Sequence, residues 1–221
     1  MSVEYDDLTF ERLGHASIRI ETGDDTVVYV DPWNDVLEGE PGDGDVVFVT
    51  HDDFDHYDPD AIAAVAGPDT TVAVYEAVDT DDLAFDVVDL PQEGETTVDG
   101  IDVETLPAYN DPDGEHVDDA GDPFHAEGDV IGLVLELADT SVFVPSDTDV
   151  LSHHESTAAD VLVPPIGGHY TMDRHEAADL ARSVEPELVL PCHYDTFDPI
   201  ETDAEAFADD LEADDIRVEL F

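Results

Sequence analysis

The sequence contains no lysine, and its 221 residues hold five arginines against 60 acidic residues. The formal net charge at pH 7 is -55. Such a chain repels nucleic-acid phosphates, so a nucleic-acid partner is not expected. The same repulsion opposes a compact fold in dilute buffer, whereas the screening length falls to about 3 Å at 1 M salt. We therefore expect an acidic, halophilic protein that works in a salt-rich cytoplasm.

Cysteine and long apolar runs are also scarce. Cys192 is the only cysteine, which excludes an intramolecular disulfide. No apolar run approaches the roughly 18 residues of a membrane span, and the acidic start MSVEYDDLTF lacks the basic region of a signal peptide. We expect a cytoplasmic protein without a membrane partner, and a homo-oligomer is compatible with the sequence.

Hydrophobic residues nevertheless make up 42% of the chain and gather in runs such as VVFV, VIGLVLEL and ELVLP. This clustering predicts a folded protein rather than a disordered one. The length suits a single domain over residues 1–221. Because acidic residues are so common, a single Asp or Glu is weak functional evidence, and histidines, glycines and aromatic residues carry more weight.

The pattern of apolar positions predicts a mixed α/β protein. Strands are expected over 8–13, 17–21, 27–30, 46–49, 71–75, 85–88, 101–106, 130–137, 141–144, 161–163, 188–190 and 217–221. Helices are expected over 58–66, 173–184 and 204–212, the first with Asp58 as N-cap and Pro59 in its first turn. The segment from Pro107 to Asp129 lacks periodicity and predicts a long loop, which inside a compact domain tends to be functional.

The stretch VTHDDFDHYDP, residues 49–59, follows an apolar strand and concentrates possible metal ligands. His51, Asp53, Asp55 and His56 could converge on a cation at the end of that strand. Imidazole together with carboxylate suits zinc, iron or manganese. In so acidic a chain, a capped loop whose histidines bind backbone groups explains the stretch equally well.

Three further candidates follow apolar strands elsewhere in the chain. Asp31 follows TVVYV, Asp147 follows SVFVPS, and His193 follows ELVLPC. Side chains released at several strand ends can assemble one site at an edge of the sheets. These residues therefore favour the metal site over the capped loop.

Seven segments together resemble the metallo-beta-lactamase superfamily, specifically its small metal-dependent hydrolases related to the ascorbate-phosphate lactonase branch. The segments are LGHASIRIE, VVYVDPW, VTHDDFDH, LPAYN, VPSDTDVL, LVPPIGGHYTM and LVLPCHYDTF, in the order of that family. The resemblance spans residues 13 to 198. It implies a four-layer αββα sandwich.

The resemblance also implies roles for individual residues. It places His51 and Asp53 at metal site one, and Asp55, His56 and His193 at metal site two. Asp147 corresponds to the aspartate that bridges both metals, and Asp31 to an aspartate that orients the metal-binding loop. Site two is thereby complete.

Site one departs from the family pattern. Asp53 stands where the family most often has a histidine, and Asn110 stands where it has another. A carboxylate is a harder, anionic ligand, whereas an amide oxygen is a weak neutral one. His125 and His116, both in the long loop, are candidates to replace the missing imidazole. We favour His125, which is close to the next strand, and expect His116 to be exposed.

The implied reaction is hydrolysis of a small ester, lactone or phosphoester by a metal-bound hydroxide, with one or two divalent ions, zinc above manganese or iron. Asp55 and Asp147 would hold the hydroxide and accept its proton. Two alternatives remain open at this level. One is a nuclease or phosphodiesterase of the same fold, and the other is a metal-binding or ligand-binding protein with little turnover because site one is altered.

Several other residues receive minor roles. His15, His169 and Tyr170 are expected beside the site as orienting or substrate-contacting groups, the last two in the glycine-containing segment GGHYTM. Ser146 and Cys192 adjoin predicted ligands but lack a nucleophile motif, so we expect packing roles. The remaining histidines, His153, His154 and His175, are predicted to lie at the surface.

Overall fold

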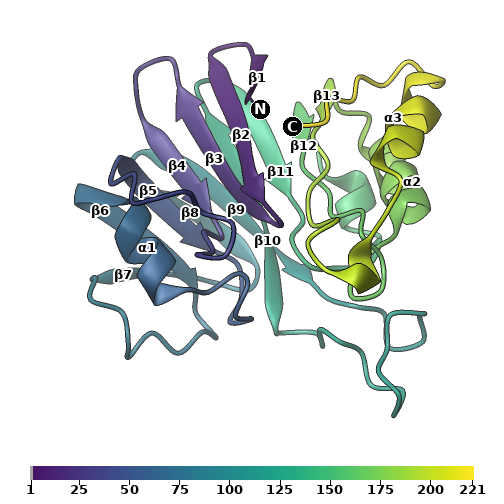
Figure 1. Cartoon of the computed structure of the whole chain (residues 1–221), viewed down its shortest axis with the longest axis horizontal. Coiled ribbons are helices and arrows are strands. Elements are labelled where there is room, and N and C mark those ends of the chain that lie inside the picture. Colours follow the sequence, from purple (N-terminus) through teal and green to yellow (C-terminus); the bar gives the residue numbers. More distant parts are fainter. Residues whose placement is uncertain (1) are drawn as a thin grey trace.

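The computed structural model describes residues 2–221, and its strands form two sheets (Figure 1). The first sheet has the order β1-β2-β3-β4-β5-β6-β7. Its strands are β1 (Ser2–Tyr5), β2 (Leu8–Gly14), β3 (Ser17–Thr22), β4 (Val27–Val30), β5 (Gly44–Val49), β6 (Ala66–Tyr75) and β7 (Val87–Leu90). Strands β1 to β4 pair antiparallel, and β4 to β7 pair parallel.

The second sheet has the order β13-β12-β11-β10-β9-β8. Its strands are β8 (Gly94–Val98), β9 (Ile101–Ala108), β10 (Val130–Leu137), β11 (Thr140–Val144), β12 (Val161–Leu162) and β13 (Leu188–Val189). Side chains from both sheets, among them Ile18, Phe48 and Leu133, form one buried apolar core. Strands β4 and β5 are buried along almost their whole length, as strands covered on both faces should be.

Helices cover the outside of the sheets (Figure 1). Helix α1 (Pro59–Val65) lies beside β5 and β6, whereas α2 (Arg174–Val184) and α3 (Ala204–Glu212) pack together against the second sheet. The predicted αββα sandwich is therefore confirmed. No helix within residues 2–221 combines the length and apolar character needed to cross a bilayer.

Helix ends follow the predicted local chemistry. The Asp58 carboxylate accepts hydrogen bonds from the backbone N–H groups of Asp60 and Ala61 at 3.0 and 3.1 Å, and Pro59 begins α1. Asp173 caps α2 in the same way, and its own backbone N–H donates to Glu176 Oε2 at 2.8 Å. These caps fix where the loops that carry the histidines enter each helix.

Two expectations about strands require correction, and two strands were not expected. The predicted closing strand over 217–221 is wrong, because Val218 makes only an isolated bridge to Val189. The strand expected over 85–88 lies at Val87–Leu90. Strands β1 and β8 were not anticipated. Both are edge strands rich in polar residues, where pairing rather than side-chain burial defines the strand.

His154 is not a surface residue as predicted, since it has 0% exposure and lies in the short helix η1 (His154–Ser156). Its Nε2 lies 2.9 Å from the Pro107 carbonyl oxygen, and its ring packs edge-on against Phe143. His153 is half-buried and approaches the same oxygen, whereas His175 is exposed as expected. Burial lowers the pKa of His154 to about 3, with a smaller contribution from His153.

Acidification should therefore destabilise the protein through His154. The folded pKa lies below the unfolded value, so this contribution is complete above about pH 6.5 and is lost as the pH falls below it. At pH 5.0 we expect a loss of about 2 kcal/mol of unfolding free energy that His154→Gln does not show. Denaturant titration at constant salt measures it, with His175→Gln as the control. Identical pH dependence in wild type and His154→Gln would contradict this assignment.

Candidate metal centre

The site is built where four chain segments meet, at the ends of β4, β5 and β11 and in the loop after β13. Asp31 follows β4, His51 follows β5, Asp147 follows β11, and His193 follows β13. All four side chains are at least nine-tenths buried. The sequence-predicted convergence of strand ends is therefore present in the fold.

Asp31 holds the loop after β5 in place through hydrogen bonds. Its carboxylate accepts hydrogen bonds from the Thr50 N–H and hydroxyl at 2.8 and 2.7 Å, and His56 Nδ1 lies 2.9 Å from its Oδ2. The Nδ1–H of His56 thus donates to Asp31, which leaves its Nε2 lone pair facing the site. Asp31 holds the loop, as the resemblance implied.

His51 is fixed by the same small network. The Thr50 hydroxyl donates to Asp31 and so accepts at its remaining lone pairs, one of which faces His51 Nδ1 at 2.9 Å. Ser146 lies 2.8 Å from that hydroxyl on the other side. His51 therefore carries its proton on Nδ1 and presents a bare Nε2, the form that a metal ligand requires.

One set of donors consists of His51, Asp53 and His125, whose ligand atoms all lie within 4.8 Å of one another. His125 Nε2 lies 3.3 Å from Asp53 Oδ2 and 3.5 Å from Asp147 Oδ2. His51 Nε2 lies 3.7 Å from Asp53 Oδ2. The loop histidine favoured from the sequence thus lies beside the two residues assigned to site one.

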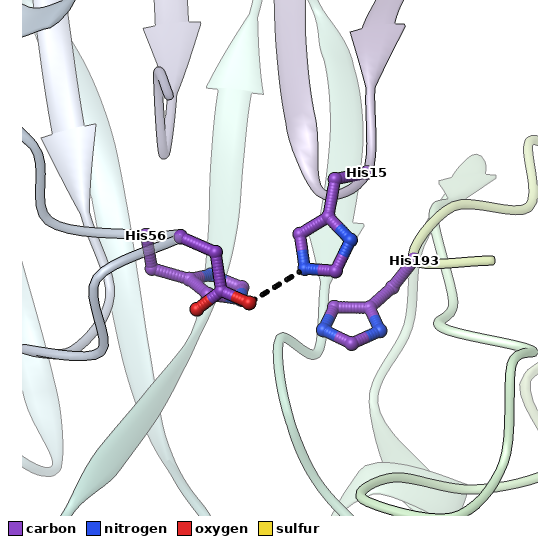
Figure 2. A group of neighbouring side chains, drawn as sticks. His15, His56 and His193 are labelled. Carbon is purple, nitrogen blue, oxygen red and sulfur yellow. Dashed lines mark ion pairs between the residues drawn. The ribbon is translucent and has the colours of Figure 1, made fainter. Parts of the chain in front are cut away.

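A second set consists of His15, Asp55, His56 and His193, again within 4.8 Å of one another. Figure 2 shows the rings of His15, His56 and His193 turned toward one region, with the ion pair of His15 drawn. His15 Nε2 lies 3.1 Å from Asp55 Oδ2, and its ring centroid is 3.9 Å from that of His193. His15, expected only nearby, has a ring nitrogen within ligand reach.

Asp147 lies between the two sets. Its Oδ2 is 3.1 Å from His193 Nε2 and 4.0 Å from His51 Nε2, and its Oδ1 is 3.6 Å from His56 Nε2. A carboxylate in this position can contact cations held by either set. Asp147 is therefore within reach of both donor sets.

The protonation states of the buried groups match a cation site. Burial raises the pKa of Asp147, but the His193 and His56 charges outweigh it and hold the pKa well below its usual range. Burial and His56 keep the pKa of His51 well below its usual value. Burial also opposes protonation of His56, yet Asp147 and Asp31 raise its pKa to about 10. A metal bound by His56 Nε2 would have to replace the proton that this raised pKa places there.

Unpartnered polar atoms provide the test of whether a metal fits. His51 Nε2, His56 Nε2 and Asp147 Oδ1 are buried and have no hydrogen-bond partner. Buried polar atoms without partners are costly and call for an explanation. Because all three atoms can donate an electron pair, divalent cations bound by the two donor sets would satisfy them.

Asn110 does not act as a weak ligand but orients His125. Its Oδ1 accepts the His125 backbone N–H at 2.8 Å and lies 3.2 Å from His125 Nδ1. Its Nδ2 donates to Asp149 Oδ1 and to the Tyr170 carbonyl oxygen, both at 2.9 Å. The amide thereby places the proton of His125 on Nδ1 and leaves Nε2 free to face Asp53.

His116 was expected to be exposed, and that expectation is wrong. It is buried, and its Nδ1 lies 2.6 Å from Asp149 Oδ1, while its Nε2 lies 3.7 Å from Glu176 Oε2. Asp149 also accepts the Asp111 N–H at 2.8 Å. His116 therefore fixes the long loop against Asp149 and Glu176, and it belongs to neither donor set.

The GGHYTM segment borders the site, as predicted. Tyr170 lines the cavity above the donors, whereas His169 is exposed and packs beside Tyr170 at 4.4 Å between ring centroids. A Cβ on Gly167 would overlap the His193 carbonyl oxygen. Glycine at this position is what lets the segment lie against the His193 loop.

Ser146 and Cys192 do not form a nucleophilic centre. Ser146 is bonded to Thr50 as described, and Cys192 Sγ lies 3.8 Å from the Val163 carbonyl oxygen inside the core. Burial raises the pKa of Cys192 to about 12. A thiol in that state is unreactive, which agrees with the packing roles expected for both residues.

Comparison with known proteins agrees with this architecture. A family model described as the beta-lactamase superfamily domain matches residues 9–193. A UPF0173 metal-dependent hydrolase from Salinibacter ruber is 34% identical over 219 residues, covering 92% of this chain and 91% of that protein. Another from Methanopyrus kandleri is 34% identical over 227 residues, covering 94% and 93%.

Two solved structures share the fold. One, from Parabacteroides distasonis, has a TM-score of 0.84 at 24% identity and covers 100% of this chain and 97% of its own. The other, the metallo hydrolase Igni18 from Ignicoccus hospitalis, has a TM-score of 0.78 at 23% identity and covers 97% and 94%. At these identities the likeness concerns the fold alone.

Proposed function

The chain belongs to the metallo-beta-lactamase superfamily, and from that premise we propose that residues 1–221 form a single metal-dependent hydrolase domain acting on a small ester, lactone or phosphoester. The observation that carries the proposal is the set of unpartnered buried atoms on His51, His56 and Asp147. Asp147 also lines a cavity large enough for a small molecule.

The proposed division of ligands follows the two donor sets. Site one takes His51, Asp53 and His125, and site two takes Asp55, His56 and His193, with Asp147 shared. Asp31 and Asn110 orient His56 and His125, and His15 orients Asp55. Site one therefore keeps three donors despite the two departures from the family pattern.

The mixture of imidazole and carboxylate donors favours zinc, with manganese or iron as alternatives. When bound, such ions supply Lewis-acid activation of a water molecule and of the substrate. The protein's own part is to hold that water and its proton. Asp55 and Asp147 have oxygens facing the cavity, and Asp55 is kept ionised because His15 and His56 outweigh the effect of burial on its pKa. Either carboxylate can accept the proton.

We further propose a small-molecule substrate and a salt-rich cytoplasm as the setting. The support is the chain's net charge of -55 and its lack of lysine, which disfavour polyanionic partners. In the long loop that carries His125, His116 contacts both Asp149 and Glu176 of α2. The loop that carries His125 is therefore already in place before a substrate binds.

Metal analysis tests the proposal directly. Protein grown with zinc, manganese and iron and purified in high salt should contain about two ions per chain. Replacing His125 by alanine should reduce the content to about one, because site one would retain only His51, Asp53 and the shared Asp147. Elemental analysis of both proteins gives the result.

His175→Ala is the matched control, since His175 is exposed on α2 and distant from both donor sets along the chain. It should keep the full metal content. Wild-type protein with less than about 0.2 ions per chain would refute the metal-dependent hydrolase. An unchanged content in His125→Ala would remove that residue from site one.

A further inference from the structure

The cavity beside the donors has a volume of about 440 Å³ and an unusual lining. The lining residues are Asp53, Phe54, Asp55, Phe124, His125, Asp147, Tyr170, His193 and Phe197. Apart from the donors, every one of them is aromatic. The part of a substrate that is not bound by metal must therefore lie against rings.

Phe54 is the most informative member of this lining. Its side chain is 67% exposed, and within residues 2–221 only Val88 is another exposed large hydrophobic residue. Phe54 lies inside the ligand loop, between Asp53 and Asp55, with its ring 5.8 Å from Trp33 and 6.5 Å from Phe197. In so acidic a chain, a phenyl ring left in water at the mouth of the site indicates a surface kept for an apolar ligand.

A second pair of rings also lines the cavity. Phe124 and Tyr170 meet edge to face with centroids 4.9 Å apart, and both line the cavity. Aromatic rings bind other rings and apolar groups with substantial contact area and defined geometry. Four aromatic rings therefore line the cavity beside the donors.

Positive side chains are missing from the cavity. The chain has no lysine, and none of its five arginines is among the lining residues. Arg12 donates to the carbonyl oxygens of His15 and Tyr194, and Arg19 pairs with Glu21 and Asp43. A phosphate or carboxylate on the substrate would find no cationic side chain to pair with.

The metal donors themselves reduce the attraction for anions. Asp53, Asp55 and Asp147 are three carboxylates that line the cavity, and the charge of two divalent ions would be largely offset by them. Asp53 contributes to this directly, because the family most often has a neutral imidazole at its position. The centre therefore has little excess positive charge to draw an anionic substrate.

Resting on the proposed function, we propose that this hydrolase acts on an uncharged substrate with an aromatic or apolar group beside the scissile carbonyl, such as a neutral aryl ester or lactone. The same features disfavour phosphoesters and narrow the proposed substrate class to uncharged esters and lactones. The rings of Phe54 and Phe197 bind the apolar group, and Asp53 lowers the affinity for anions.

Binding can be measured without turnover by using benzamide, acetamide and phenyl phosphate with the metal-loaded protein in high salt. Trp33 is the only tryptophan and lies 5.8 Å from both Phe54 and Phe197, so its fluorescence reports occupancy. Benzamide should bind at least about tenfold more tightly than acetamide. Phe54→Ala and Phe197→Ala should each weaken benzamide binding about three- to tenfold and leave acetamide unchanged. Calorimetry on the same samples confirms the constants.

Val88→Ala is the matched control, because it removes the other exposed large hydrophobic side chain and lies in β7, outside the cavity lining. It should bind benzamide as the wild type does. Equal affinity for benzamide and acetamide, or no saturable signal with benzamide, would overturn the apolar subsite. The apolar subsite would also be refuted if Phe54→Ala and Phe197→Ala both bound benzamide as tightly as Val88→Ala does.

Measuring hydrolysis provides a second test of the proposed substrate class. The kcat/KM for p-nitrophenyl benzoate should exceed that for p-nitrophenyl phosphate by at least about a hundredfold, and Phe124→Arg should reduce this ratio about tenfold. A ratio near one, or in favour of phosphate, would overturn the substrate class and leave the hydrolase intact. If neither compound is hydrolysed while benzamide still binds selectively, the proposed function fails and the neutral, aromatic ligand preference stands.

Discussion

Replacing His193 by alanine should lower kcat for a chromogenic ester by about two to three orders of magnitude. His193 Nε2 is 3.1 Å from the shared Asp147, and its ring stacks 3.9 Å from His15 and 5.5 Å from His56 between centroids. The neighbouring imidazoles are already engaged, since His15 Nε2 is paired with Asp55 and His56 is itself assigned to site two. The variant should also lose about one metal ion per chain.

The fold should survive this change. The His193 backbone N–H donates to the His15 carbonyl oxygen at 2.9 Å, and alanine preserves that bond. Metal content, kcat and thermal unfolding are measured together, with His175→Ala beside them as an exposed histidine that should change none of the three. Wild-type metal content combined with a wild-type rate in His193→Ala would refute its assignment as a ligand.

The second large effect concerns salt. Lowering KCl from about 3 M to about 0.1 M should unfold most of the protein, because the screening length grows from below 3 Å to about 10 Å and exposes the repulsion of a net charge of -55. The few cations cannot offset it, since Arg19 and Arg182 already pair with several carboxylates each. Far-ultraviolet circular dichroism and Trp33 fluorescence should show one transition.

A charge-reversal variant separates screening from other effects of salt. Glu38, Glu40, Glu93, Glu95 and Glu127 are exposed, and replacing all five by lysine should move the midpoint of the transition to lower KCl. Replacing the same five by aspartate keeps the charge and should leave the midpoint nearly in place. A midpoint that does not respond to the lysine variant would mean that repulsion is not what salt relieves.

Local chemistry made much of the fold predictable. The Asp58-Pro59 and Asp173 caps set the starts of α1 and α2, and uninterrupted apolar runs marked β4, β5 and β10. Strands β1 and β8 escaped prediction because polar edge strands are defined by a partner that lies elsewhere in the chain. The same reason explains why the expected strand over 217–221 is only a single bridge.

The candidate site was predictable where ligands follow strands directly. The sequence predicted His51, Asp147 and His193 as ligands on this ground, and the fold brings their side chains close together. The loop histidines were harder, because His116 has acidic neighbours in the sequence that suggest exposure, yet it is buried against Asp149, which is 33 residues away. The surface position predicted for His154 was wrong for the same reason, since the burial of its ring depends on Phe143 and Pro107, which belong to other strands.

The sequence by itself determined the charge, the strand ends that carry ligands and the two departures from the family pattern, because each depends on residue type and on nearest neighbours along the chain. Only the tertiary structure decided which loop histidine lies beside Asp53. His125 reaches it across 72 residues because Asn110 holds its ring, while His116 is turned away by Asp149. The apolar, cation-free cavity was also decided by the fold, since Phe54, Phe124 and Phe197 become one surface only when three distant loops pack together.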